Sequence, residues 1–151
     1  MSRCRSLAFV ALIVSIFTPV CQAQDQIRNS PQAGGRTHSV NYKDMVLANC
    51  IATAYKDEPG AAKDAGSSVS ALRDWTSFDL DQATGPIHDL VTDYLSRDYQ
   101  NPMVESEVKG VRFDLLKCLD LYHSDALEAQ IKRWSDTPDR SYRQDHPALG
   151  E

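Results

Sequence analysis

The sequence predicts an all-α fold, a compact bundle of about five helices stapled by one disulfide, and three observations support this prediction. Apolar residues recur with a period of about 3.6 in five separate segments. No segment has the alternating pattern of a strand, and the chain has neither internal repeats nor stretches of low complexity. Beyond an N-terminal export signal, the chain keeps only two cysteines, Cys50 and Cys118, each inside a helix-like segment.

Residues 1–23 have the features of a cleaved export signal. Arg3 and Arg5 form a short basic start, and an apolar run from Leu7 to Phe17 follows. Ala23 ends the segment with a small residue, as signal peptidases require. The run is shorter than the roughly 20 apolar residues that span a bilayer, so we expect cleavage and not anchoring.

A lipoprotein signal is the alternative, because Cys21 follows the apolar run closely. Lipid attachment requires a small residue before that cysteine, and this chain has Val20 there. The sequence therefore favours a cleaved signal.

The first predicted helix begins at Val40, after a leader. Residues 24–39 are polar and interrupted by proline and glycine, which predicts a flexible segment. From Val40 to about Asp57 the apolar residues form one helical stripe. The stripe consists of Val46, Leu47, Cys50, Ile51, Ala54 and Tyr55.

Two further helices are expected before residue 100. Pro59 suits the first turn of the second helix, because a missing N–H costs nothing there. That helix is weak at Gly66 and then gains apolar residues as far as Phe78. The sequence Thr84-Gly85-Pro86 predicts a break, and a third helix is expected from Ile87 to about Tyr99.

The second half of the chain predicts a loop, two helices and a tail. Residues 101–109 contain apolar residues without a sustained period, which indicates an exposed loop or short hairpin. The fourth helix runs from Phe113 to Tyr122, with its leucines on the apolar side. Ser124 or Asp125 caps a fifth helix, and residues 40–138 complete the helical domain. Residues 139–151 are expected to form a loose C-terminal tail.

The charge of the chain argues against several classes of ligand. Two of the 16 basic residues and none of the 21 acidic residues lie in the signal, so the mature chain has a formal net charge of −7. An acidic protein without a basic face cannot release counterions from nucleic acid, nor does it suit an anionic membrane. A basic protein partner fits this charge better.

The two mature cysteines favour a disulfide, because an exported protein meets an oxidising compartment. Closing so long a loop would stabilise the fold by about 4 kcal/mol in the chain-entropy model. It also requires the first and fourth helices to lie side by side. The alternative, a catalytic thiolate at Cys50 or Cys118, is less favoured because leucine and isoleucine neighbours raise a thiol pKa.

No motif indicates catalysis, a cofactor or a metal. The chain lacks a P-loop, a nucleophile elbow and a His-Glu-x-x-His motif. The best metal candidate groups His88 with Asp89 and Asp93, whose spacing is more typical of a solvated helix face. We therefore expect a binding protein rather than an enzyme.

Two long blocks, Asp44–Asp57 and Phe113–Ser124, resemble the type VI secretion system amidase immunity proteins, with further similarity at Ala71–Trp75 and in residues 93–102. The resemblance covers most of the mature chain, from about Tyr42 to Arg140. It implies a small helical periplasmic protein that binds a cysteine peptidoglycan amidase toxin and occludes its active cleft. It also implies a homodimer, no cofactor, and a disulfide between Cys50 and Cys118.

On this basis the loop that follows the third helix is the expected toxin-binding surface. Its candidate contact residues are Asp98, Tyr99, Asn101, Met103, Val104, Glu105 and Glu107. Loops on a rigid scaffold commonly carry binding function. Two other classes stay open: a periplasmic helical adaptor for another exported protein, and an enzyme that uses a reduced cysteine.

Overall fold

A computed structural model describes residues 30–105 and 108–147, and within these ranges it contains helices and no β-strand. Five helices form the body: α2 (His38–Ala54), α3 (Pro59–Asp74), α4 (Leu80–Ser96), α6 (Asp114–Tyr122) and α7 (Asp125–Trp134). Three short elements accompany them, the 3-10 helix η1 (Ala33–Gly35), α5 (Pro102–Glu105) and α8 (Tyr142–Asp145). The predicted all-α class and the number of main helices are confirmed.

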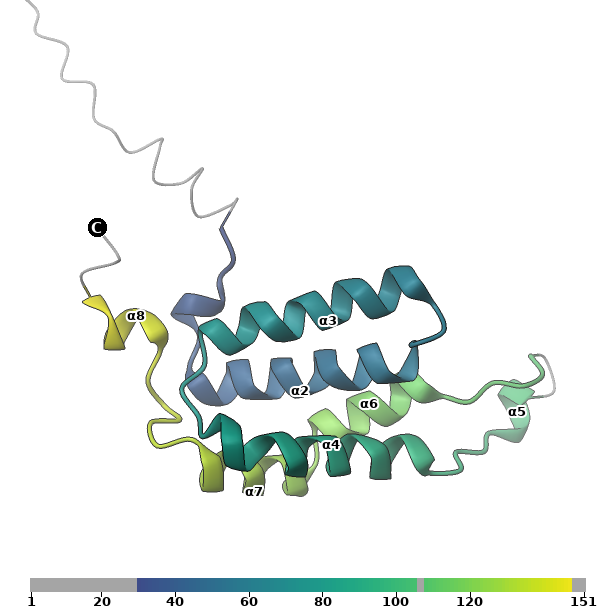
Figure 1. Ribbon diagram of the computed structural model, residues 1–151. Helices are drawn as coiled ribbons and strands as arrows, with labels where there is room; N and C mark the ends of the chain where they lie inside the picture. Colours follow the sequence, from purple (N-terminus) through teal and green to yellow (C-terminus); the bar gives the residue numbers. More distant parts are fainter. Residues whose placement is uncertain (1–29, 106–107, 148–151) are drawn as a thin grey trace, which may run out of the picture. The chain divides into compact units, whose positions relative to one another are not determined.

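Helix α2 is the centre of the bundle. It contacts α3, α4, α6 and α7, and Figure 1 shows it between α3 on one side and α4 and α6 on the other. The core is built from the inward stripes of α2, α4, α6 and α7, whereas no residue of α3 is buried. None of the helices described is long and apolar enough to cross a membrane.

Tyr42 of α2 is a fully buried residue of the core. Its ring meets Phe78 edge to face, with the ring centroids 5.3 Å apart, and its hydroxyl lies 3.4 Å from the side-chain oxygen of Gln130. Burial raises the pKa of Tyr42 to about 12, because a phenolate would lose its hydration there. Phe78 was predicted inside the second helix, but it lies in the turn between α3 and α4.

The predicted disulfide between Cys50 and Cys118 is confirmed. Both cysteines are fully buried, and their Cα atoms are 5.6 Å apart. The bond joins α2 to α6, as the side-by-side packing of these helices requires. Neither cysteine presents a thiol, so the alternative of a cysteine nucleophile loses its reactive group.

The predicted break at Thr84-Gly85-Pro86 is wrong, because α4 runs through it from Leu80 to Ser96. Asp79 caps the helix by accepting a hydrogen bond from the N–H of Gln82 at 3.0 Å. Beyond the cap, Ala83, Ile87, Val91 and Tyr94 form one buried stripe on both sides of the proline. Burial of this continuous stripe outweighs the hydrogen bond that Pro86 cannot donate.

Helix α6 forms where predicted, but it is turned with its leucines outward. Leu115, Leu116 and Leu119 are exposed, whereas Asp114, Lys117, Cys118 and Leu121 are buried. The disulfide explains this orientation, because Cys118 must face α2, and Asp114 and Leu121, four residues before it and three after it, turn inward with it. Leu116 and Leu119 then fall on the flank away from α2, whereas Leu115 is exposed beside the hollow at Tyr55.

The end of the chain differs from the loose tail that we expected. Residues 139–147 are described, and they contain α8, whose first turn has a capping box between Ser141 and Gln144. The preceding backbone bonds to the start of α2: His38 N–H donates to the carbonyl of Arg140 at 2.7 Å and Ser39 N–H to that of Pro138 at 2.9 Å. Polar contacts of this kind have no periodicity, so the sequence pattern gave no sign of them.

His38, the first residue of α2, also holds this segment through a side-chain hydrogen bond. Its side chain is buried, and Nδ1 accepts a hydrogen bond from the backbone N–H of Ser77 at 3.0 Å. The ring proton therefore lies on Nε2, which donates to Asp145 at 2.7 Å. His38 lies in the expected flexible leader but starts α2, with Thr37 as its N-cap.

Candidate functional site

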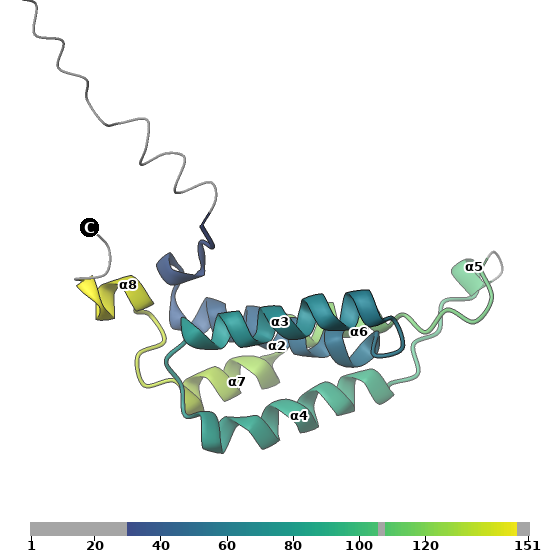
Figure 2. The same ribbon diagram turned by 45° about the horizontal axis from the view of Figure 1, so that its top comes forward.

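The most prominent feature outside the bundle is the segment between α4 and α6, residues 97–112, which we call the arm. It leaves the end of α4, carries the short helix α5, and returns to α6 (Figures 1 and 2). In both views it projects away from the helices of the body. The arm contains the loop or short hairpin that the sequence predicted at residues 101–109. The described residues of that stretch, 101–105 and 108–109, which we call the tip, contain the short helix α5.

Asn101 organises the tip of the arm. Its side-chain oxygen accepts hydrogen bonds from the backbone N–H groups of Met103 at 3.2 Å and Val104 at 3.4 Å. This is N-cap geometry, and it explains why α5 begins directly after Asn101. The N–H of Val108 donates to the carbonyl of Val104 at 2.9 Å.

The tip exposes apolar side chains. Met103 has 83% of its surface exposed, Val108 54% and Val104 37%. Asp98 is also exposed. The side chain of Glu105 and the whole of Glu107 lie outside the described residues, so two of the candidate contact residues have no placement. An apolar group held away from its own core is a common sign of a contact surface.

The base of the arm is polar and well connected. Tyr99 donates a hydrogen bond from its hydroxyl to Asp120 of α6 at 2.7 Å, and this bond raises the pKa of Tyr99. Arg97 lies 3.4 Å from the ring centre of Tyr94 and donates to Asp93 at 2.8 Å, which raises the pKa of Arg97. Tyr99 is thus half-buried against α6 and not part of the free tip.

The arm re-enters the bundle through a strained turn. Phe113 has φ 55° and ψ 30°, the left-handed conformation, which costs a bulky residue about 1–2 kcal/mol. Directly after it, Asp114 pairs with Arg112 at 2.5 Å and with Lys117 at 3.2 Å. Lys117 also donates to the backbone carbonyl of Leu95 at 3.2 Å.

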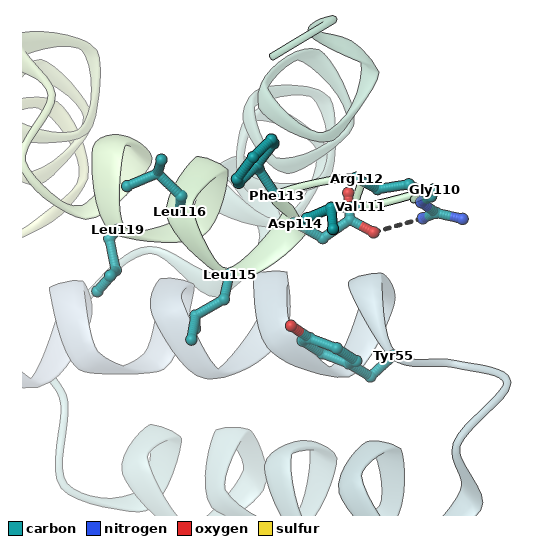
Figure 3. A pocket seen from close by; sticks show the side chains of 9 residues that line it. All are labelled: Tyr55, Gly110, Val111, Arg112, Phe113, Asp114, Leu115, Leu116 and Leu119. Atoms are coloured by element: carbon teal, nitrogen blue, oxygen red, sulfur yellow. Dashed lines mark hydrogen bonds and ion pairs between the residues drawn. The ribbon is translucent and has the colours of Figure 1, made fainter. Parts of the chain in front are cut away.

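Beside the arm lies the leucine face, which we define as Leu115, Leu116 and Leu119 of α6. These side chains are 47%, 46% and 40% exposed. A hollow of about 500 Å³ borders them, between Tyr55 at the end of α2 and residues 110–114 (Figure 3). Phe113 and Leu116 also line a second hollow of about 350 Å³, with residues 98–101 of the arm. The leucine face and the arm base therefore share one surface.

Sequence reasoning missed the leucine face. It placed the leucines of α6 on the core side, because three leucines in five positions (115–119) outweigh one cysteine in a count of hydrophobicity. A helical wheel oriented by Cys118 would have placed Leu116 and Leu119 on the flank away from α2. Nothing in the sequence indicated that Asp120 accepts a hydrogen bond from Tyr99.

The metal and catalytic candidates do not come together. His88 is exposed and approaches only Asp89, at 3.5 Å, while Asp93 pairs with Arg97. Among residues 30–105 and 108–147, no group of three or more histidine, cysteine and carboxylate side chains could hold a metal ion. What the described surface offers is an exposed apolar tip and an apolar helix face.

The sequence of this chain matches a known family of proteins. The family model Tai4, described as type VI secretion system (T6SS) amidase immunity protein, matches residues 40–131. The match covers more than half of the 151-residue chain, and the chain belongs to this family. It begins at the third residue of α2 and ends inside α7, so it includes the arm and the leucine face.

Two solved structures share the fold. One comes from work on new type VI-secreted toxins and self-resistance proteins in Serratia marcescens; it is 24% identical, has a TM-score of 0.70, and the match covers 79% of this chain and 94% of that chain. The other is the effector–immunity system Tae4/Tai4 from Salmonella typhimurium, at 23% identity and a TM-score of 0.59, covering 70% and 96%. The curated proteins gave no match.

Proposed function

We propose that this protein is a periplasmic immunity protein that binds a cognate type VI secretion peptidoglycan amidase and occludes its active cleft. Membership of the amidase immunity family supports a partner of this kind. The arm is the observation that carries the mechanism, because a narrow projection with an exposed apolar tip suits a cleft. On this proposal the protein contributes no catalytic group and protects the cell wall from self or sibling attack.

Export is part of the proposal. The amidase's substrate is the cell wall, so an inhibitor must act in the periplasm. The disulfide between Cys50 and Cys118 suits an oxidising compartment of this kind. Residues 1–23, the proposed cleaved signal, lie outside the described residues.

The first test is a binding and inhibition assay. Residues 24–151 are mixed with a candidate cognate type VI secretion amidase, and affinity and peptidoglycan cleavage are followed together. We expect nanomolar affinity and loss of cleavage. Absence of binding by an oxidised, folded sample would reject the proposal and leave the alternative, a periplasmic helical adaptor, whose partner a pull-down would name.

The contact surface is tested at the tip of the arm. Met103→Asp combined with Glu105→Lys should weaken inhibition at least tenfold and leave the melting temperature unchanged, because the side chain of Met103 is 83% exposed. Leu80→Asp, at a leucine of α4 that is 42% exposed, is the matched control and should bind normally. An unchanged affinity in the double variant would reject the assignment of Asp98, Tyr99, Asn101, Met103, Val104, Glu105 and Glu107 as contacts.

We also propose a homodimer in which a second copy covers the leucine face. A two-fold contact brings the same patch together twice, so it must be self-complementary, and an apolar helix face meets this condition. The rest of an acidic chain would repel its copy. Leu116→Glu with Leu119→Glu should give a monomer by light scattering, and a persisting dimer would place the interface elsewhere.

A further inference from the structure

Lys117 is a charged residue that faces inward, and its surroundings connect the two ends of the arm. It is 5% exposed, and Asp114, one helical turn before it, is 9% exposed. Burial of a charge is unfavourable unless the charged group is paired and hydrogen-bonded. The partners of this ammonium therefore indicate what the burial achieves.

The ammonium of Lys117 has contacts in three directions. It donates to the carboxylate of Asp114 at 3.2 Å and to the backbone carbonyl of Leu95 at 3.2 Å. It also lies 5.9 Å from the centre of the Tyr99 ring, within the range of a cation–π contact. Leu95 precedes the arm in the chain, Tyr99 belongs to its outgoing side, and Asp114 follows its return.

The returning side is held by a second link. The other carboxylate oxygen of Asp114 accepts a hydrogen bond from Arg112 at 2.5 Å, so Asp114 connects the last residue of the arm to Lys117. Figure 3 shows the Arg112–Asp114 contact at the rim of the hollow beside the leucine face. Between them, Phe113 keeps its left-handed conformation, which persists only where neighbouring contacts fix it.

A purely local role for this pair explains only half of the arrangement. Asp114 in the first turn of α6 suits the helix dipole, and an aspartate and lysine three residues apart stabilise a helix modestly. Neither effect needs the bond from Lys117 to the carbonyl of Leu95 on another helix. Buried ion pairs are also weak contributors to net stability, so stabilisation of α6 does not by itself account for this pair.

We propose that Lys117 is a positioning residue for inhibition: its buried ammonium clamps the outgoing and returning ends of the arm and so fixes the direction in which the tip is presented. This inference rests on the proposed function of the arm. The clamp keeps the arm in its binding-competent direction before the amidase arrives. It acts through the arm and does not contact the amidase.

The clamp predicts a kinetic signature that differs from loss of a contact. If Lys117→Met lowers the fraction of arms in the competent direction to about a tenth, the apparent Kd rises about tenfold. The loss falls on the association rate, and the dissociation rate stays as in the wild type, because the final contacts are intact. Met103→Ala, a change at the tip, should instead raise the dissociation rate.

Lys43→Met is the matched control. Lys43 also pairs with a carboxylate, at 2.6 Å from Glu128, and lies 4.8 Å from the ring centre of Tyr122, but it joins α2 to α7 and not the arm. The double variant Asp114→Asn with Lys117→Met removes both buried charges, so it leaves no unpaired ion and carries the test if the single variant folds poorly.

Two measurements decide the proposal: association and dissociation rates with the amidase, and backbone NMR order parameters of Tyr99 and Val111. In the clamp variants we expect about tenfold slower association and order parameters that fall from about 0.85 towards 0.6, with Lys43→Met unchanged in both. Unchanged order parameters, or a loss confined to dissociation, would overturn the clamp. If the wild type itself does not bind the amidase, the proposed function fails, while the order parameters still decide whether Lys117 orients the arm.

Discussion

The arm and the closing segment, residues 135–147, contain the loop predicted at residues 101–109 and most of the tail predicted at residues 139–151, and they are bonded to the bundle differently. The closing segment is bonded along its length, through the backbone of residues 38 and 39 and the buried ring of His38. Among the described residues, the base of the arm bonds to the body through Tyr99 and the Lys117 group, and Asn101 bonds to the backbone of Met103 within the tip. Figures 1 and 2 show the two stretches at opposite ends of the bundle.

This difference separates two uses of polar residues. In the closing segment, hydrogen bonds to α2 contribute to the fold. In the arm, the same kinds of group fix an orientation and leave the apolar tip exposed. We therefore expect changes in the closing segment to affect stability, and changes in the arm to affect binding.

The largest effect should come from the disulfide, since it joins the helix that holds the closing segment to the helix that holds the arm. Cys50→Ser combined with Cys118→Ser should lower the free energy of unfolding by about 4 kcal/mol, because the bond closes a loop with a sequence separation of 68. Urea denaturation measures this change. A loss below about 1 kcal/mol would mean that packing of α2 on α6 alone holds both regions.

His38→Ala should have the next largest effect on stability, and it should weaken the closing segment without changing the arm. It leaves the N–H of Ser77 without its acceptor and removes one of the two partners of Asp145, which keeps its bond from Arg140, so we expect a loss of about 2–3 kcal/mol with unchanged amidase affinity. His88→Ala, at an exposed histidine, is the control and should change stability by less than about 0.5 kcal/mol. Weaker amidase binding by a folded His38→Ala protein would contradict the division of roles.

Acid should destabilise the closing segment, because the pKa of Asp145 is lower in the folded protein than in the unfolded chain. The hydrogen bond from His38, and then the one from Arg140, lower the pKa of this carboxyl in the folded protein. The unfolded chain, with a pKa of about 3.9, therefore binds the proton more readily. The contribution of Asp145 is fully present above that pKa and is lost as the pH falls through the lower folded value.

The variant Asp145→Asn tests this linkage. Its free energy of unfolding should fall less steeply than that of the wild type between about pH 5 and pH 2. Asp139→Asn, at an exposed residue of the same segment, should keep the wild-type slope. Equal slopes for Asp145→Asn and the wild type would exclude Asp145 as the group responsible.

Met103→Ala should have the smallest effect on stability and sharpens the comparison at the arm. With 83% of its surface exposed, the side chain contributes little to the core, so the free energy of unfolding should change by less than about 0.5 kcal/mol. Amidase affinity, measured by calorimetry, should nevertheless fall. A clear loss of stability would show that the tip packs on the body.

The sequence predicted the parts of this fold that depend on periodicity and on cysteine number. Five main helices, the disulfide and the Ser124 cap of α7 all followed from local pattern. The predicted break before Ile87 was wrong, because local propensity at Gly85 and Pro86 could not reveal the stripe buried on both sides.

The sequence predicted where the candidate site lies but not the contacts that hold it in place. The apolar residues of the loop, Met103 and Val104, drew attention because no period explained them. The clamp at Lys117 escaped notice, because lysine on a helix is ordinarily a surface residue and its burial depends on the disulfide that turns α6. Contacts between distant polar groups, such as Tyr99 with Asp120, have no signature in a single sequence.

The outward projection of the arm has a consequence for how such proteins diverge. Substitutions at its tip cost the fold little, so this stretch can accumulate changes while the bundle below stays as it is. On the proposed function, an amidase with an altered cleft can be matched by mutation of a few residues around α5, without a compensating change in the helices. The scaffold and the recognition element are thereby free to evolve at different rates.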